Sequence, residues 1–115
     1  MNWPWKKDPR TLLEDALQLL EREADPTSQS VIQKLNKISA KLANHPAAPS
    51  EAKAGMAEAI KTLQNPNLVK DHKRLVVETA KLRIQGGINS VIGLEYKKMS
   101  DEALAEAQRR LKNKH

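Results

Sequence analysis

The amino-acid sequence predicts an all-α fold: a compact single-domain bundle of five to six short helices around a central helix at about residues 66–85. Apolar residues recur every three or four positions in several segments, which is the spacing of one helical face. Phenylalanine is absent and aromatic residues make up only 3% of the chain, so the core must be aliphatic, which suits packed helices. Capping residues stand beside prolines at several points, and this pairing marks helix starts.

The first seven residues, 1–7, form a Trp-containing arm ahead of a single helical domain at 8–115. Pro4 separates Trp3 from Trp5 and prevents a regular helix there. Two indoles followed by two lysines are suited to anchoring a partner protein, stacking on bases or lying in a membrane interface. The alternative is that the arm folds back and covers one end of the bundle, because exposed paired tryptophans favour aggregation.

The first two helices are predicted to pack as an antiparallel hairpin. Asp8 caps the first helix, Pro9 takes its first position, and the helix ends by Ala24. The second helix begins after a tight Asp-Pro turn, with Thr27 or Ser28 as its cap. Its apolar residues alternate by four and three and form a narrow buried seam: Val31, Leu35, Ile38 and Leu42.

The second helix also carries the strongest nucleic-acid feature of the sequence. No acidic residue occurs between Asp25 and Glu51, and within this window Lys34, Lys37 and Lys41 line one ridge, which we call the lysine ridge. Lysines flanked by amide and hydroxyl side chains are typical of phosphate contacts. The alternative is that the lysine ridge faces the acidic side chains of the first helix within the same molecule.

A third helix is predicted from Ser50, its cap, to Gln64. Its inward-facing residues are Ala52, Met56, Ala59, Ile60 and Leu63. Gly55 lies beside this face, although a glycine inside a helix costs about 1 kcal/mol. We therefore expect the backbone of another element to approach Gly55 closely.

The central helix has the clearest start and stop signals of the sequence. Asn65 caps it, Pro66 takes its first position, and Gly86-Gly87 supplies a left-handed stop. A broad apolar arc predicts contacts on two sides: Leu68, Val69, His72, Leu75, Val76, Thr79, Ala80 and Leu82. The opposite edge is basic, with Lys70, Arg74 and Lys81. This edge is either a binding surface or a solvated face with an Arg74–Glu78 pair.

The C-terminal part is predicted to hold one short element and a last helix. Ile88–Met99 fits a short helix or a strand, and Gly93 weakens both alternatives. Ser100 then caps the last helix, whose narrow apolar stripe is suited to docking on the bundle or on another chain. Arg109 and Arg110 at its end are suited either to gripping phosphates or to complementing the helix dipole.

Several function classes are disfavoured by the residues themselves. The three histidines lie on separate predicted elements without metal-site spacing, and His72 on the apolar arc is expected to be partly buried. Without cysteine there is no thiol nucleophile and no disulfide framework, which favours a cytoplasmic protein. We expect no enzyme activity, no cofactor, no metal and no small-molecule substrate. No apolar run is long enough for a transmembrane segment.

The net charge of +6 permits an anionic partner, and most of the excess lies in residues 65–115. The sequence therefore favours a small basic binding protein that contacts nucleic acid with weak sequence specificity. The residues expected to bind nucleic acid or an acidic protein are Lys34, Lys37, Lys41, Lys70, Arg74, Lys81, Arg109 and Arg110. The alternative is a protein–protein interaction module, an adaptor or inhibitor, that docks through Trp3 and Trp5 or through the last helix. A peripheral membrane contact is the third hypothesis, and the oligomeric state stays open.

Overall fold

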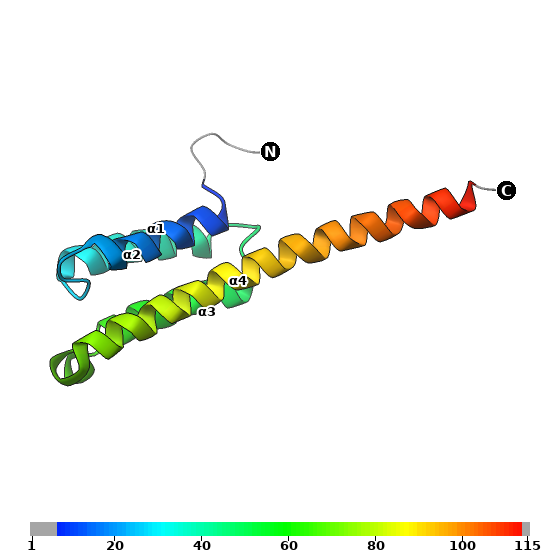
Figure 1. Ribbon diagram of the computed structural model, residues 1–115. Coiled ribbons are helices and arrows are strands. Elements are labelled where there is room, and N and C mark those ends of the chain that lie inside the picture. The colour runs from blue at the N-terminus through cyan, green and yellow to red at the C-terminus, as the bar shows by residue number, and fades with distance from the viewer. Residues whose placement is uncertain (1–6, 114–115) are drawn as a thin grey trace.

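A computed structural model describes residues 7–113, and within them the protein consists of four helices and no strands. The helices are α1 (Pro9–Arg22), α2 (Gln29–Ala43), α3 (Ser50–Leu63) and α4 (Pro66–Lys112). They run up and down in sequence order, so that each packs beside the next and α4 closes the bundle against α1 and α3 (Figure 1). The predicted all-α, single-domain bundle is confirmed, but the prediction of five to six helices is wrong.

The starts of the helices follow from their capping residues. The Asp8 carboxylate accepts a hydrogen bond from the Thr11 N–H at 2.7 Å, and the Ser28 hydroxyl accepts one from the Val31 N–H at 3.3 Å. Asn65 caps α4 through its side-chain oxygen, and Pro66 follows at the first helical position. At α3 the prediction of Ser50 as the cap is wrong: the cap position is Pro49, one residue earlier, and Ser50 is the first helical residue.

The core of the bundle is aliphatic throughout. All five inward residues predicted for α3 are buried, and Leu13, Leu35 and Leu42 are fully buried on the first two helices. No polar or charged side chain is buried among residues 7–113. Within the core the four helices are therefore held together by apolar burial and close packing.

The predicted close approach of another backbone to Gly55 is confirmed, and the structure shows that α4 is the helix that approaches it. A Cβ added at Gly55 would lie 2.7 Å from the Arg83 carbonyl oxygen and 3.7 Å from the Gly87 nitrogen. A Cβ at Gly87 would in turn lie 3.3 Å from the Ala52 Cα and from the Leu13 side chain. Gly55 and Gly87 thus let the two backbones approach each other directly.

The prediction that α4 stops at Gly86-Gly87 is wrong. α4 runs on to Lys112, and no glycine within residues 7–113 has a positive φ. Ile88–Met99 is helical, and Ser100 is an interior residue of α4 instead of the cap of a separate last helix. The C-terminal part of α4 leaves the bundle as a single projecting helix, which gives the molecule a length of 70 Å and a width below 30 Å (Figure 1).

The turn between α1 and α2 is tied to the start of α4. Asp25 accepts hydrogen bonds from the Thr27 hydroxyl and N–H, and its carboxylate lies 3.0 Å from the Lys73 Nζ. The Thr27 hydroxyl and the Lys73 ammonium hold the pKa of Asp25 at about 2, below its usual value. Near this contact α4 has a kink at His72, whose φ of −138° and ψ of 44° are not helical.

Candidate functional site

The lysine ridge lies on the edge of α2 that faces α1. The buried residues Val31, Leu35 and Leu42 fix the inner side of α2, and this orientation turns the ridge towards the groove between the two helices. The groove has a volume of about 390 Å³. Its lining combines five cations and one carboxylate with an apolar floor: Lys7, Leu12, Asp15, Gln18, Leu19, Arg22, Lys34, Lys37, Ile38 and Lys41. We call this feature the basic groove.

Ion pairs within the molecule account for only part of this charge. Lys34 Nζ lies 3.5 Å from a Glu23 carboxylate oxygen, and Lys7 Nζ lies 2.5 Å from Asp15. Arg22, Lys37 and Lys41 form no ion pair within residues 7–113. Pairing with α1 therefore occupies one lysine of the ridge and leaves the other two charges facing solvent in the basic groove.

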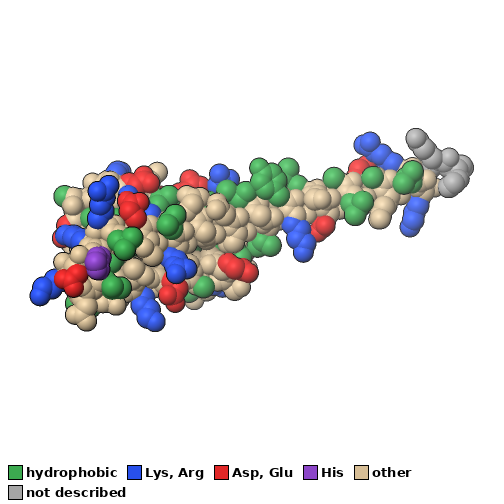
Figure 2. Space-filling view, turned by 60° about the horizontal axis from the view of Figure 1, so that its bottom comes forward, with side chains coloured by type: hydrophobic (Ala, Val, Ile, Leu, Met, Phe, Trp, Pro, Cys, Tyr) green, Lys and Arg blue, Asp and Glu red, His purple; other side chains and the backbone are tan. Residues whose placement is uncertain are grey.

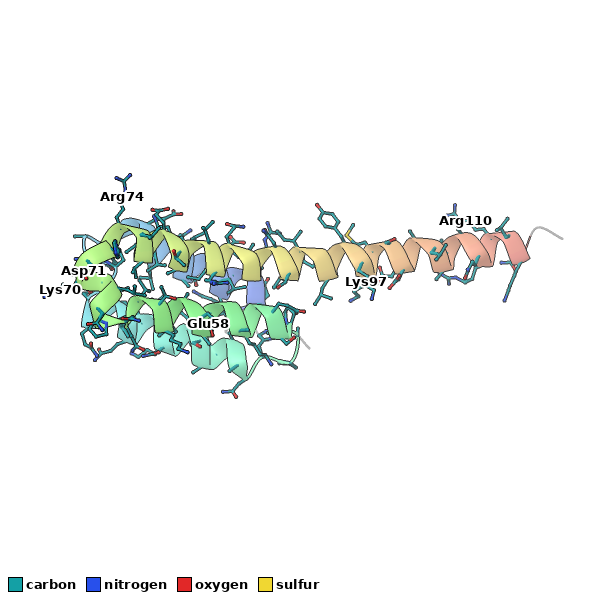
Figure 3. The ribbon with its side chains drawn as sticks, turned by 90° about the horizontal axis from the view of Figure 1, so that it is seen from below. Glu58, Lys70, Asp71, Arg74, Lys97 and Arg110 are labelled. Atoms are coloured by element: carbon teal, nitrogen blue, oxygen red, sulfur yellow. The ribbon has the colours of Figure 1, made fainter. Side chains whose placement is uncertain are left out.

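The other predicted basic residues do not gather around this groove. Lys70 and Arg74 lie at one end of α4 and Arg110 lies near the opposite end (Figure 3). Lys81 pairs with Glu78 at 3.4 Å, whereas the predicted pair of Arg74 with Glu78 is not formed. Glu106 pairs with both Arg109 and Arg110. The eight cations thus form separate clusters along a 70 Å molecule instead of one surface.

Two further predictions concern residues at the ends of the chain and at the kink. Trp3 and Trp5, the predicted partner anchor, lie outside the described residues. The prediction that His72 is partly buried is wrong: it is exposed, at the kink in α4. Among residues 7–113 no group of three acidic or histidine side chains is placed to hold a metal ion.

The second candidate surface is the outer face of α4. Val76, Ala80, Ile84, Ile88 and Val91 are buried against α3 and α1 and define its inner face. At 100° per residue, the leucines on the opposite side point away from the bundle. Leu75 and Leu82 are 64% and 71% exposed, and Leu104 and Leu111 on the projecting part are 60% and 66% exposed. The predicted broad arc that placed Leu75 and Leu82 in the core is therefore wrong.

Small residues lie between these leucines on the same outer face. Gly86, Gly93, Ser100 and Ala107 recur every seven residues, and we call them, together with Leu75, Leu82, Tyr96, Leu104 and Leu111, the outer stripe. A Cβ at Gly86 or Gly93 would meet no atom within 4 Å, so neither glycine is required by packing within the chain. Each of these two glycines destabilises the helix by about 1 kcal/mol relative to alanine, and no contact within the chain requires a glycine there.

The outer stripe was missed at the sequence level because α4 was divided at Gly86-Gly87. The signal that identifies it is the seven-residue spacing of Gly86, Gly93, Ser100 and Ala107, which continues the face of Leu75 and Leu82 to Leu104 and Leu111. Figure 2 shows hydrophobic side chains along the projecting helix, separated by charged ones, with no second element over the face in view.

No helix among the described residues combines the length and the apolar character needed to cross a membrane. No family model, no curated protein and no solved structure matches this chain. The basic groove and the outer stripe are thus characterised by their own geometry and chemistry alone.

Proposed function

We propose that this protein is a non-catalytic interaction module that holds a helical partner along the outer stripe of α4. The observation that carries the proposal is the projecting part of α4, about twenty residues of lone helix with exposed Leu104, Leu111 and Tyr96. Helices in proteins gain most of their stability from packing an apolar face, and the projecting part has no such packing within the described residues. A partner on the outer stripe supplies that packing.

The free energy gained by covering the stripe leucines is moderate. Burying a leucine side chain completely contributes about 1.5–3 kcal/mol, so covering the exposed part of each of the four stripe leucines contributes about 1–2 kcal/mol. Their sum, about 4–8 kcal/mol, lies within the range of about 4–15 kcal/mol that association costs in lost freedom. Contacts from Tyr96 and from the stems of flanking side chains are therefore needed as well, and the partner must follow the stripe over much of its length.

The test compares exposed leucines on two sides of the same projecting helix. Leu104→Gln/Leu111→Gln removes the apolar side chains of the stripe there. Leu94→Gln changes a leucine that is 49% exposed but points about 80–100° away from Leu104 and Leu111. In affinity capture from the native source, a partner should be retained by the wild type and by Leu94→Gln and lost by the double variant. Equal retention by all three would refute the outer stripe as the binding face.

A second function, binding of a nucleic-acid backbone, is favoured by the basic groove. We propose that Arg22, Lys37 and Lys41, which have no ion pair within residues 7–113, each neutralise one phosphate. Affinity for duplex DNA should then fall with salt with a log–log slope of about −2.7, and Lys37→Glu/Lys41→Glu should reduce the slope to about −0.9.

The matched control for this second function is Arg109→Glu/Arg110→Glu, which reverses the same amount of charge at the far end of α4. This variant should leave the slope unchanged if the basic groove holds the phosphates. If both double variants weaken binding equally, the attraction comes from the net charge of +6 and the groove is not a site.

A further inference from the structure

We propose that the partner on the outer stripe is a second copy of this chain, whose α4 lies antiparallel to the first with the twofold axis at Gly93. This inference rests on the proposed interaction function of the outer stripe and specifies its partner. It follows from the sequence order of the stripe, the side of α4 on which it lies, its charges and its length.

The outer stripe is symmetric about Gly93 in residue type. Leu75 and Leu82 lie eighteen and eleven residues before Gly93, and Leu111 and Leu104 lie eighteen and eleven residues after it. Eighteen residues complete five helical turns, so both outer leucines point in the same direction as Gly93. An antiparallel copy centred on Gly93 therefore places Leu75 and Leu82 of one chain level with Leu111 and Leu104 of the other.

The small residues obey the same symmetry and allow the two backbones to meet. Gly86 and Ser100 stand seven residues on either side of Gly93, and Thr79 and Ala107 stand fourteen residues on either side. Small residues at an interface let helices approach closely, and a seven-residue repeat keeps the seam facing a partner helix. The open space around Gly86 and Gly93 is then filled by the second copy.

The bundle does not obstruct this arrangement. The inner face of α4, with Ala80 and Ile84 at its centre, packs on α3 and α1, and the outer stripe faces the opposite direction. Each bundle thus lies outside the helix pair, and the projecting part of each α4 covers the exposed leucines on the bundle of the other copy.

Flanking charges favour the antiparallel orientation over the parallel one. Arg83 and Asp101 lie on the same flank of the stripe, ten residues before and eight residues after Gly93, and neither forms an ion pair within residues 7–113. An antiparallel copy brings each Arg83 within about one turn of the Asp101 of the other copy. A parallel copy in register makes no such contact, because equivalent flanks then lie on opposite sides of the helix pair and Arg83 and Asp101 are eighteen residues, about 27 Å, apart along the axis.

The length of the stripe decides between pairing of the whole α4 and pairing of the projecting part alone. From Leu75 to Leu111 α4 extends about 54 Å, and with a contact width of about 10 Å the two copies together bury about 1,100 Å². Specific interfaces bury about 1,200–2,000 Å², with about 1,000 Å² as the lower bound. Pairing of the projecting parts alone gives about half this area, below what a stable dimer needs.

The first experiment measures mass by sedimentation equilibrium over a range of protein concentrations. The wild type and Leu94→Gln should sediment as dimers with equal dissociation constants. Leu82→Gln removes two stripe leucines from a symmetric dimer, and at about tenfold for each the dissociation constant should rise about 100-fold. A cooperative urea unfolding transition retained by each variant verifies that the bundle is intact, because the projecting part alone loses its packing when the dimer dissociates.

The second experiment measures orientation, and the absence of cysteine from the chain makes single spin labels specific. Copies of a label at Leu94→Cys, one residue from the axis, should lie within about 30 Å of each other across the helix pair. Copies at Gln108→Cys should lie about 45 Å apart, because each is fifteen residues from the axis at 1.5 Å per residue. Short distances at both positions would instead show a parallel pair and overturn the proposal.

A wild-type chain that stays monomeric at all concentrations also overturns self-pairing. The proposed interaction function fails separately, because it is tested by the capture experiment with Leu104→Gln/Leu111→Gln. A monomeric chain that retains another protein through these leucines would leave that function standing without the second copy.

Discussion

Replacing Gly55 by alanine tests how tightly α3 and α4 pack. The new Cβ would lie 2.7 Å from the Arg83 carbonyl oxygen, which belongs to the backbone and cannot turn aside. The two helices must separate by several tenths of an ångström, and because the obstructing atom belongs to the backbone we expect the upper part of the usual range for overpacking, about 2–3 kcal/mol. Alanine regains about 1 kcal/mol of helix propensity. The net loss in the free energy of unfolding should be about 1–2 kcal/mol, or about 5–10 °C in Tm.

The assay is urea unfolding followed by circular dichroism at one protein concentration. The control is Ala54→Gly at the exposed neighbouring position in α3, which measures the propensity difference without any packing change and should cost about 1 kcal/mol. If Gly55→Ala is as stable as the wild type, or more stable, the close approach of the α4 backbone is not rigid and the packing described for Gly55 is wrong.

Three further outcomes are expected from urea unfolding. Leu35→Ala at a fully buried position should cost about 2–5 kcal/mol, and a loss below 1 kcal/mol would contradict its burial. Asn65→Ala removes the cap of α4 and should cost about 1 kcal/mol, whereas Asn65→Asp keeps the acceptor and should be neutral. Because the folded-state pKa of Asp25 is lowered to about 2, the stabilisation from its carboxylate is complete above about pH 4 and is lost as the pH falls from about 4 towards 2. Asp25→Asn should flatten the fall of the urea midpoint in that range, and an unchanged fall would contradict the lowering of the Asp25 pKa by Thr27 and Lys73.

The parts of the fold that depend on neighbouring residues could be predicted from the sequence. The caps at Asp8, Ser28 and Asn65 act within three residues of themselves, so their positions follow from local chemistry. The inner face of α3 was also predicted, because its apolar residues lie on one side only. Gly55 was correctly interpreted as a point of close approach, although the sequence does not reveal which helix approaches it.

The C-terminal half was mispredicted because glycine has two uses in a helix. At a helix end glycine permits the left-handed conformation, but inside a helix it permits close packing. Gly87 permits close packing against Ala52 and Leu13. These residues are far from Gly87 in the sequence, so no local sequence pattern predicts the contact. Once α4 was divided there, Leu75 and Leu82 were assigned to the core, and the continuous outer stripe was lost.

The candidate sites were predicted in part for the same reason. The helical spacing of the lysine ridge places its three residues on one edge of α2, as the groove lining confirms. Which of them forms an ion pair depends on the position of α1. Only the structure shows that Glu23 pairs with Lys34, whereas Lys37 and Lys41 form no ion pair within residues 7–113. Whether the remaining charges bind phosphates stays a prediction.

The passage of α4 from the bundle into the projecting segment without a loop constrains how this protein can change in length. A loop absorbs an inserted residue, but one residue added between Val91 and Leu104 rotates everything beyond it by about 100° about the helix axis. Leu104 and Leu111 would then no longer lie on the side of Leu75 and Leu82. Seven residues added or removed restore their direction to within about 20°. We expect the projecting segment to tolerate insertions and deletions only in whole heptads.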